Sequence, residues 1–297
     1  MFLLNAKYNG VNGWSKFVLT FGLCIGLYIL SSLPMIIYSQ WAMLSTDEIG
    51  VYTSPFGFAL TLFVFSGFIA GIVLGTRYVH ERQILSVFTG NDIFRWKRFL
   101  QGLSIWFVIL LGTELIGYLV DPSTYVFQFD LQPFLGLLLV SVLVLPIQTT
   151  AEELFFRGYL MQQIALIFQY RWVPILITSI LFGAMHLSNP EVAQYGLFKS
   201  MSLYIGLGLF FAIIAVMDNG LELPIGIHFI NNFYSFVLVG YENSVFEGVP
   251  SVFLKSYEEL TLGAVISNLM IMVIALFLMQ KYLKWPSFSL LFERIKS

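Results

Sequence analysis

The sequence predicts an all-α fold, a polytopic bundle of transmembrane helices with about eight spans. Hydrophobic residues make up 58% of the 297 residues and charged residues only 11%, whereas soluble domains carry about 25% charged residues. The mean hydropathy is +0.83, so the chain lacks the polar residues that a water-exposed surface needs. The apolar residues also gather in runs close to the ~20 residues with which a helix crosses a bilayer.

Eight such runs follow one another along the chain. The fourth is interrupted by polar residues and the fifth is short. The segment Met1 to Gly13 has no small-residue cleavage site after an apolar core, so we expect no removable signal peptide. We expect a single integral membrane domain over residues 1–297. The predicted spans lie near residues 17–38, 56–78, 99–120, 135–157, 173–189, 197–217, 221–240 and 261–280.

Lysine and arginine are distributed unevenly between the segments that join these spans. With the N-terminus inside, thirteen of the fifteen fall on the inside, and only Lys199 and Lys255 fall outside. Positive residues stay on the cytoplasmic side of membrane proteins, so we expect both termini to be cytoplasmic. The sequence contains no basic stripe, so we expect no nucleic-acid partner. Simple loops without organelle targeting favour a multi-pass protein of a bacterial plasma membrane.

Ionisable residues inside spans are costly to bury and are functional in most membrane proteins. Of the three histidines, His186 and His228 lie within spans, whereas His80 lies in the basic inner loop, where we expect a solvated side chain. Glu114, in the third span, has no motif around it and is expected to be a hydrogen-bonded partner of the core. The single cysteine, Cys24, is expected to be a small buried apolar residue.

Two adjacent acids, Glu152 and Glu153, interrupt the fourth span. Glu153 and Arg157 are four residues apart, the spacing of a helical ion pair with its acid on the N-terminal side. Glu152 lies ~100° further around the helix and has no neutralising partner at that spacing. We therefore expect Glu153 and Arg157 to support the structure and Glu152 to act as a general base. Pro146 removes a backbone donor and predicts a bend before the pair.

The two intramembrane histidines each share a helix face with a residue four positions away. Phe182 precedes His186, and Asn232 follows His228, at the spacing of one helical turn. A lone intramembrane histidine is more often an interhelical hydrogen-bonding residue than a catalyst. Because lipid cannot satisfy these polar groups, they must point into the bundle, and we expect them to converge there with the glutamates.

Taken in order, these residues resemble the three motifs of the CPBP family, the CAAX-protease and bacteriocin-processing intramembrane proteases, also called the Abi family. The motif-bearing region runs from about 135 to 240, roughly a third of the chain. The motifs are Glu152-Glu153-x-x-x-Arg157, Phe182-x-x-x-His186 and His228-x-x-x-Asn232.

The resemblance implies an intramembrane endopeptidase that hydrolyses a peptide bond near the membrane. Glu152 and His186 would activate a water molecule, and His228 and Asn232 would form the oxyanion hole. The resemblance also implies a peptide or membrane-associated protein as substrate. The residues that it implies as structural support are Glu153, Arg157 and Phe182.

A zinc-dependent version of the same protease is an alternative, with Glu152, His186 and His228 as ligands. Two histidines and a carboxylate are a known catalytic zinc set. However, the sequence contains no His-Glu-x-x-His helix, and Asn232 is a poor zinc ligand and a good oxyanion donor. The residues therefore favour a metal-free mechanism without a cofactor.

Two non-proteolytic functions compete with this interpretation. The first is a membrane immunity factor or regulatory scaffold, against which the complete set of motif residues argues. The second is a secondary transporter with a glutamate and histidine proton relay. It would need paired discontinuous helices or an inverted repeat, and the sequence predicts only the bend at Pro146.

Overall fold

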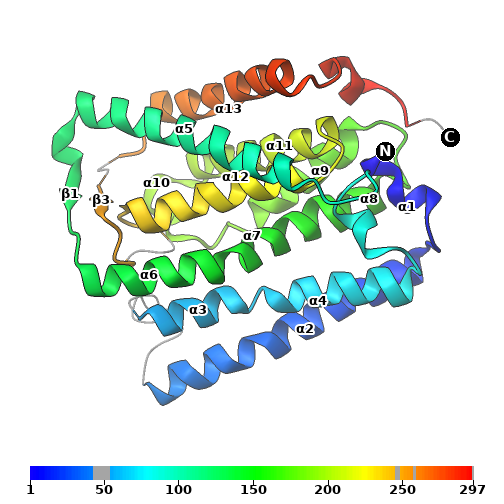
Figure 1. Ribbon diagram of the computed structural model, residues 1–297, viewed down its shortest axis with the longest axis horizontal. Coiled ribbons are helices and arrows are strands. Elements are labelled where there is room, and N and C mark those ends of the chain that lie inside the picture. Colours follow the sequence, from blue (N-terminus) through cyan, green and yellow to red (C-terminus); the bar gives the residue numbers. More distant parts are fainter. Residues whose placement is uncertain (43–53, 245–247, 257–258, 296–297) are drawn as a thin grey trace.

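The computed structural model describes residues 1–42, 54–244, 248–256 and 259–295, and these form a layered bundle of helices (Figure 1). Of the six long apolar segments in the described residues, four are single helices: α2 (Trp14–Trp41), α5 (Trp96–Val120), α11 (Leu197–Met217) and α13 (Leu262–Leu283). The second helical segment joins α3 (Pro55–Phe63), α4 (Ser66–Leu74) and the π-helical η3 (Gly75–Val79). The fourth joins α6 (Leu131–Leu143), α7 (Leu145–Glu153), the π-helical η6 (Leu154–Leu160) and α8 (Met161–Ile164).

Shorter elements complete the described part of the chain. They are η1 (Phe2–Leu4), α1 (Asn5–Tyr8), η4 (Ile84–Val87), η5 (Pro122–Thr124), α9 (Trp172–Ala184), α10 (Pro190–Tyr195), α12 (Glu222–Phe233), the π-helical η7 (Tyr234–Leu238) and η8 (Phe288–Phe292). The strands β1 (Tyr125–Phe127), β2 (Val239–Tyr241) and β3 (Phe253–Lys255) form a small sheet in the order β1-β3-β2. β3 is antiparallel to β1 and parallel to β2. The predicted helical fold class is confirmed, and the sheet is an addition to it.

Each predicted span coincides with a helical segment of the structure. By length and composition, six helices of the described residues can cross a membrane: Trp14–Trp41, Pro55–Val79, Trp96–Val120, Leu131–Ile164, Leu197–Met217 and Leu262–Leu283. The chain is therefore an integral, multi-pass membrane protein. α9 is a shorter apolar helix. α12 and η7 together correspond to the seventh predicted span. The number of crossings remains a prediction.

The helix is interrupted at the place where the sequence predicts a bend, just before Pro146. α6 ends at Leu143 and α7 begins at Leu145, with Pro146 in its first turn. Proline fits there because the first amides of a helix have no intrahelical partner. The break at Val144 separates the apolar α6 from α7, which carries the two glutamates.

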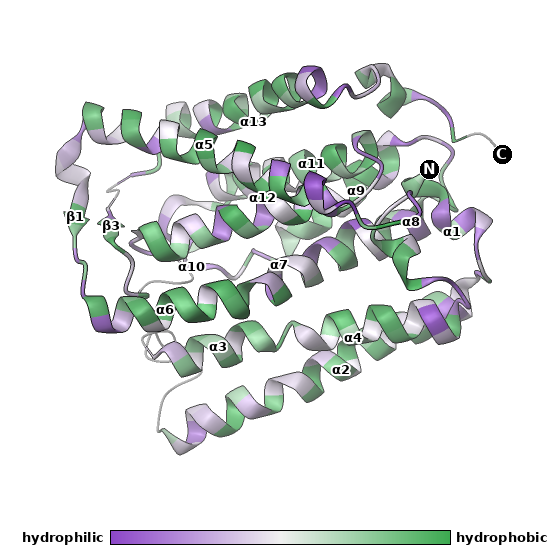
Figure 2. Ribbon diagram, in the orientation of Figure 1, coloured by the Kyte–Doolittle hydropathy of each residue, from purple (hydrophilic) through white to green (hydrophobic). Residues whose placement is uncertain are grey.

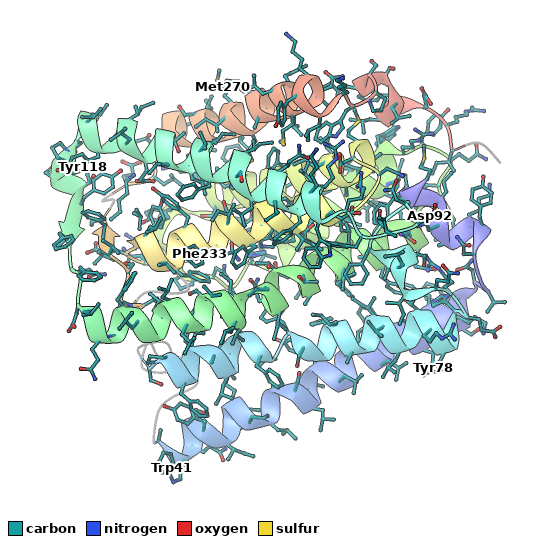
Figure 3. The ribbon with its side chains drawn as sticks, in the orientation of Figure 1. Trp41, Tyr78, Asp92, Tyr118, Phe233 and Met270 are labelled. Carbon is teal, nitrogen blue, oxygen red and sulfur yellow. The ribbon has the colours of Figure 1, made fainter. Side chains whose placement is uncertain are left out.

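The outward faces of the peripheral helices are apolar (Figure 2). Only 11% of the apolar window of α2 and 6% of that of α5 are buried inside the protein, so lipid covers the rest. Trp41 and Tyr118 lie toward one end of the bundle and Tyr78 toward the other (Figure 3). Amphipathic rings favour the membrane interfaces, so these positions agree with helices that cross the membrane. The helical turns η1 and η8, near the two chain ends, lie at the end of the bundle that carries Tyr78 (Figures 1 and 3). The assignment of that end to the cytoplasm remains a prediction.

α12 lies at the centre of the bundle and packs closely against α5. Every residue from Glu222 to His228 is buried. A Cβ on Gly226 would come within 2.2 Å of the Phe99 carbonyl oxygen, and one on Gly102 within 2.5 Å of the Leu223 carbonyl oxygen. Small residues let membrane helices approach this closely. The contact fixes the position of the helix that carries His228 and Asn232.

An ion cluster holds the first turn of α12. Arg95 donates from Nε to Glu222 Oε1 at 3.0 Å and from Nη2 to Asp218 Oδ2 at 2.9 Å. Arg98 Nε lies 3.3 Å from Asp218 Oδ1, and Trp285 Nε1 donates to the same oxygen at 2.7 Å. Both carboxylates are fully buried. The cluster joins the start of α5 to the α11–α12 junction and to the segment after α13.

The prediction of a solvated His80 is wrong. The side chain is fully buried, with Nδ1 at 3.0 Å from the Val11 carbonyl oxygen and Nε2 at 3.1 Å from the Tyr159 hydroxyl. The N-terminal residues fold back over the loop that follows η3, and local sequence gives no sign of such a tertiary cover. Burial lowers the pKa of His80, which favours the neutral ring.

Glu114 and Cys24 have structural partners. Glu114 pairs with Lys255 on β3 and with the Tyr125 hydroxyl on β1, so it fastens the C-terminal end of α5 to the sheet. Among the described residues, its hydrogen bonds and ion pair do not include a motif residue. Cys24 is fully buried, as predicted, and faces Gly71 of α4.

We predict that Arg95→Ala lowers the free energy of unfolding by about 3–5 kcal/mol, because it leaves Glu222 as a buried charge without its cation. The measurement is denaturant unfolding in detergent micelles. The control is Lys199→Ala, which breaks the exposed pair with Glu259 and should cost less than about 1 kcal/mol. Equal small losses in both variants would contradict the prediction.

The defect of Arg95→Ala should also depend on pH. Burial raises the pKa of Asp218, and Arg95 opposes that effect. A carboxyl with a raised folded-state pKa stabilises the fold when it is protonated, and this contribution is lost as the pH rises through that pKa. Without Arg95 the pKa of Asp218 is raised further. The difference in the free energy of unfolding between the variant and the wild type should therefore narrow as the pH falls below neutral. A defect of constant size would contradict this.

Candidate active site

The motif residues lie on three neighbouring elements: the α7–η6 segment, α12 and α9. The described part of the structure brings Glu152, Glu153, Arg157, His228 and Asn232 into one network of polar contacts. His186 reaches the same region from the end of α9 through a shared aromatic ring. The predicted convergence therefore holds for the glutamates, His228 and Asn232, whereas His186 lies beside them.

Glu153 is fully buried and has two partners. Its Oε1 accepts from Arg157 Nη1 at 2.9 Å and lies 2.9 Å from His228 Nδ1. The predicted ion pair with Arg157 is confirmed, although Arg157 lies in the π-helical η6 rather than in a regular α-helix. Glu153 therefore also orients the imidazole of His228 on α12, because a hydrogen bond at one ring nitrogen sets the role of the other nitrogen.

Arg157 is enclosed by aromatic rings. Its guanidinium carbon lies 4.5 Å from the centre of the Phe182 ring and 5.4 Å from that of Phe211. Nη2 donates to the Gly208 carbonyl oxygen of α11 at 3.1 Å. Cation–π contacts are stronger when both groups are desolvated. The predicted supporting role of Phe182 thus has a physical form, a ring that covers the buried cation.

Glu152 has neighbours that the sequence did not predict. Gln148, one turn earlier on α7, donates its amide to Glu152 Oε1, and His228 Nε2 lies 3.7 Å from Glu152 Oε2. The side chain of Glu152 keeps 15% of its surface exposed, whereas that of Glu153 has none. His228 therefore stands between the two glutamates, and Glu152 is the acid that solvent or substrate can reach.

A chain of amide hydrogen bonds holds Asn232 beside Glu152. Asn232 Nδ2 donates to Gln148 Oε1 at 3.1 Å, and Asn231 Nδ2 donates to Asn232 Oδ1 at 3.2 Å. Trp106 of α5 donates to Asn231 Oδ1 at 3.0 Å. These contacts fix the direction of the Asn232 amide. Sequence reasoning missed Gln148, although a neutral polar side chain one turn before Glu152 is a usable signal.

His186 is positioned by aromatic contacts. Its Nδ1 lies 2.7 Å from the Phe182 carbonyl oxygen, and its ring stacks on Tyr204 of α11 with centroids 4.3 Å apart. The Phe182 ring lies between the two histidines, 4.8 Å from His186 and 6.3 Å from His228. Among the described residues, His186 forms no hydrogen bond with Glu152. It therefore lies beside the network rather than in it.

The residues of the zinc alternative do not form a ligand set as placed. No three His, Cys, Asp or Glu side chains come close enough to hold a metal ion within the residues that the structure describes. The His186 ring contacts the Phe182 carbonyl and Tyr204, and His228 contacts both glutamates. A zinc ion shared by Glu152, His186 and His228 would need these contacts to be rearranged.

Comparison with known proteins agrees with the motifs. Residues 132–234 match the family described as Type II CAAX prenyl endopeptidase Rce1-like, a stretch that begins in α6 and includes all the motif residues. A protein named "Uncharacterized protein YyaK" from Bacillus subtilis (strain 168) is 28% identical over 259 residues, which cover 82% of this chain and 84% of that protein. No solved structure matches.

The family match, the order of the motifs and their convergence in the bundle agree with one another. The chain is a multi-pass membrane protein. Its resemblance to the CPBP family of CAAX-type intramembrane proteases is supported by the match of residues 132–234 to the Rce1-like family.

Proposed function

We propose that the protein is an intramembrane endopeptidase that cleaves a peptide or a membrane-associated protein at a bond near the membrane. The observation that supports this most directly is the environment of Glu152. Its carboxylate is partly exposed, is hydrogen-bonded by Gln148 and lies 3.7 Å from His228 Nε2. A carboxylate in this setting is suited to act as a general base on a water molecule.

In the proposed reaction Glu152, assisted by His186, removes a proton from water while the water oxygen bonds to the scissile carbonyl carbon. The oxyanion that forms accepts hydrogen bonds from Asn232 Nδ2 and from His228 Nε2. Because His228 Nδ1 already donates to Glu153, the second of these donors requires a proton on both ring nitrogens of His228. Such preorganised donors are worth ~3–4 kcal/mol each in a dry site. The C–N bond then breaks as the proton passes from Glu152 to the leaving amine, and the products are a carboxylic acid and an amine.

The hydrogen bonds around Asn232 suit this role. Its Oδ1 accepts from Asn231, so its amide nitrogen points toward Gln148 and Glu152. An amide nitrogen carries two hydrogens, and the contact with Gln148 uses one of them. The second is the donor that we assign to the oxyanion. The mechanism uses side chains alone, with no cofactor. We place the protein in a bacterial plasma membrane, in line with its relative from Bacillus.

We predict that Glu152→Gln lowers cleavage by about 10²–10⁴-fold, because the amide is nearly isosteric but cannot accept the proton of water. The measurement is quantitative proteomics of cells with the wild-type or variant chain, which should reveal a membrane-associated peptide that accumulates uncut. Asp92→Asn, at an exposed acid outside the site, is the matched control. A cellular phenotype that survives Glu152→Gln at normal expression would instead favour a scaffold or immunity role.

Glu153→Gln should mainly affect stability. It leaves Arg157 buried without a counter-charge, which costs about 3–5 kcal/mol, whereas Glu152→Gln leaves that pair intact. The measurement is the unfolding temperature of both variants in the same detergent. If the two glutamates contribute equally to stability, the division of roles between them is wrong.

Gln148→Leu should lower the cleavage rate by about 10–100-fold without unfolding the protein, because small misplacements of catalytic groups are costly. The leucine has similar volume but neither donates to Glu152 nor accepts from Asn232. The rate is measured on the peptide identified by the proteomic comparison. Gln132→Leu, at an exposed glutamine of α6, is the control and should leave the rate unchanged. An unchanged rate in Gln148→Leu would remove this residue from the site.

A further inference from the structure

A groove with a polar wall lies between α5 and α13, away from the motif residues. Its volume is about 490 Å³, and its lining consists of Lys97, Leu100, Gln101, Ser104, Ile105 and Tyr282. Both helices lie on the same side of the bundle (Figure 1), and their outward faces are apolar and exposed. The groove therefore opens toward the lipid.

The polar residues of α5 in this groove form a stripe. Lys97, Gln101 and Ser104 are spaced four and three residues apart, which places them on one helix face. At 1.5 Å per residue they extend over ~10 Å from the N-terminal end of α5. Trp96, exposed at the first position of the helix, marks the membrane interface at that end. The stripe thus runs from the headgroup level toward the hydrocarbon.

Within the described ranges, the donor groups of this stripe have no protein partner. The Lys97 ammonium, the Gln101 amide nitrogen and the Ser104 hydroxyl make no hydrogen bond or ion pair there, and neither does the Tyr282 hydroxyl on the opposite wall. Gln101 uses only its oxygen, which accepts from Arg98 at 3.2 Å. Lys97 lies at the headgroup level, whereas Gln101 and Ser104 lie further along the helix, where donors without a partner are costly next to hydrocarbon. A molecule with several acceptors that extends from one level to the other would satisfy all of these donors.

We propose that the groove binds an anionic phospholipid. Its phosphate would accept from Lys97 and Gln101, its glycerol ester oxygens would accept from Ser104 and Tyr282, and an acyl chain would lie along Leu100 and Ile105. Charge complementarity selects this occupant, because Lys97 is a cation without an acid while the nearby Arg95 and Arg98 are engaged by Asp218. Basic pockets between helices on the cytoplasmic side are typical sites for such headgroups.

The test is native mass spectrometry of the full-length protein in detergent with added phosphatidylglycerol or phosphatidylcholine. One phosphatidylglycerol molecule should bind about fivefold more tightly than phosphatidylcholine, the effect of one lysine near an anionic headgroup. In the double variant Lys97→Gln, Ser104→Ala this preference should disappear. Equal binding of the two lipids to the wild type, or an unchanged preference in the double variant, would overturn the proposal.

Two further measurements make the result specific to the groove. Arg77→Gln removes an exposed cation near the same end of the bundle, on η3, and should leave the preference intact; a loss as large as in the double variant would show general charge attraction instead. Soluble glycerol phosphate should not displace the lipid from the wild type at equal concentration, because it lacks the acyl chain. Displacement would show that the anion alone is bound and would overturn the lipid assignment.

Discussion

The buried ion pair between Glu153 and Arg157 is the interaction on which the arrangement of the site depends. Both side chains are fully buried, and neither charge is stable there without the other. Each also forms a hydrogen bond with a neighbouring helix. Glu153 reaches α12 through His228, and Arg157 reaches α11 through the Gly208 carbonyl oxygen. One pair on one segment therefore positions two further helices. Breaking such a pair costs far more than forming it contributes, which makes it a positional constraint rather than a source of stability.

α5 provides the second constraint, because it fixes the depth and rotation of α12. Near the start of α5 Arg95 holds Glu222 and Asp218, further along Gly102 and Gly226 bring the backbones together, and beyond them Trp106 holds Asn231. Each contact would tolerate a small shift alone, but the three together do not. The histidine and the asparagine of α12 thus meet the glutamates of α7 in a fixed register.

The sequence predicted the parts of this arrangement that depend on local spacing. The predicted spans follow from runs of apolar residues, the bend near Pro146 from the missing proline amide, and the pairing of Glu153 with Arg157 from their spacing within one segment. The contacts of His80 with Val11 and Tyr159 and of Glu114 with Lys255 join residues far apart in the chain. Spacing along a helix carries no information about them, because they depend on which helix packs beside which.

Gln148 and Gln101 illustrate what structure adds to the interpretation of polar residues in apolar segments. Both are neutral amides on membrane helices, and sequence alone treats them alike. Gln148 uses both ends of its amide inside the bundle, on Glu152 and Asn232, so it belongs to the site. Gln101 uses only its oxygen and directs the rest into a groove open to lipid. Every polar group in a membrane needs a partner. Where that partner lies therefore distinguishes a residue such as Gln148, which positions the groups of the site, from a residue such as Gln101, which faces the bilayer.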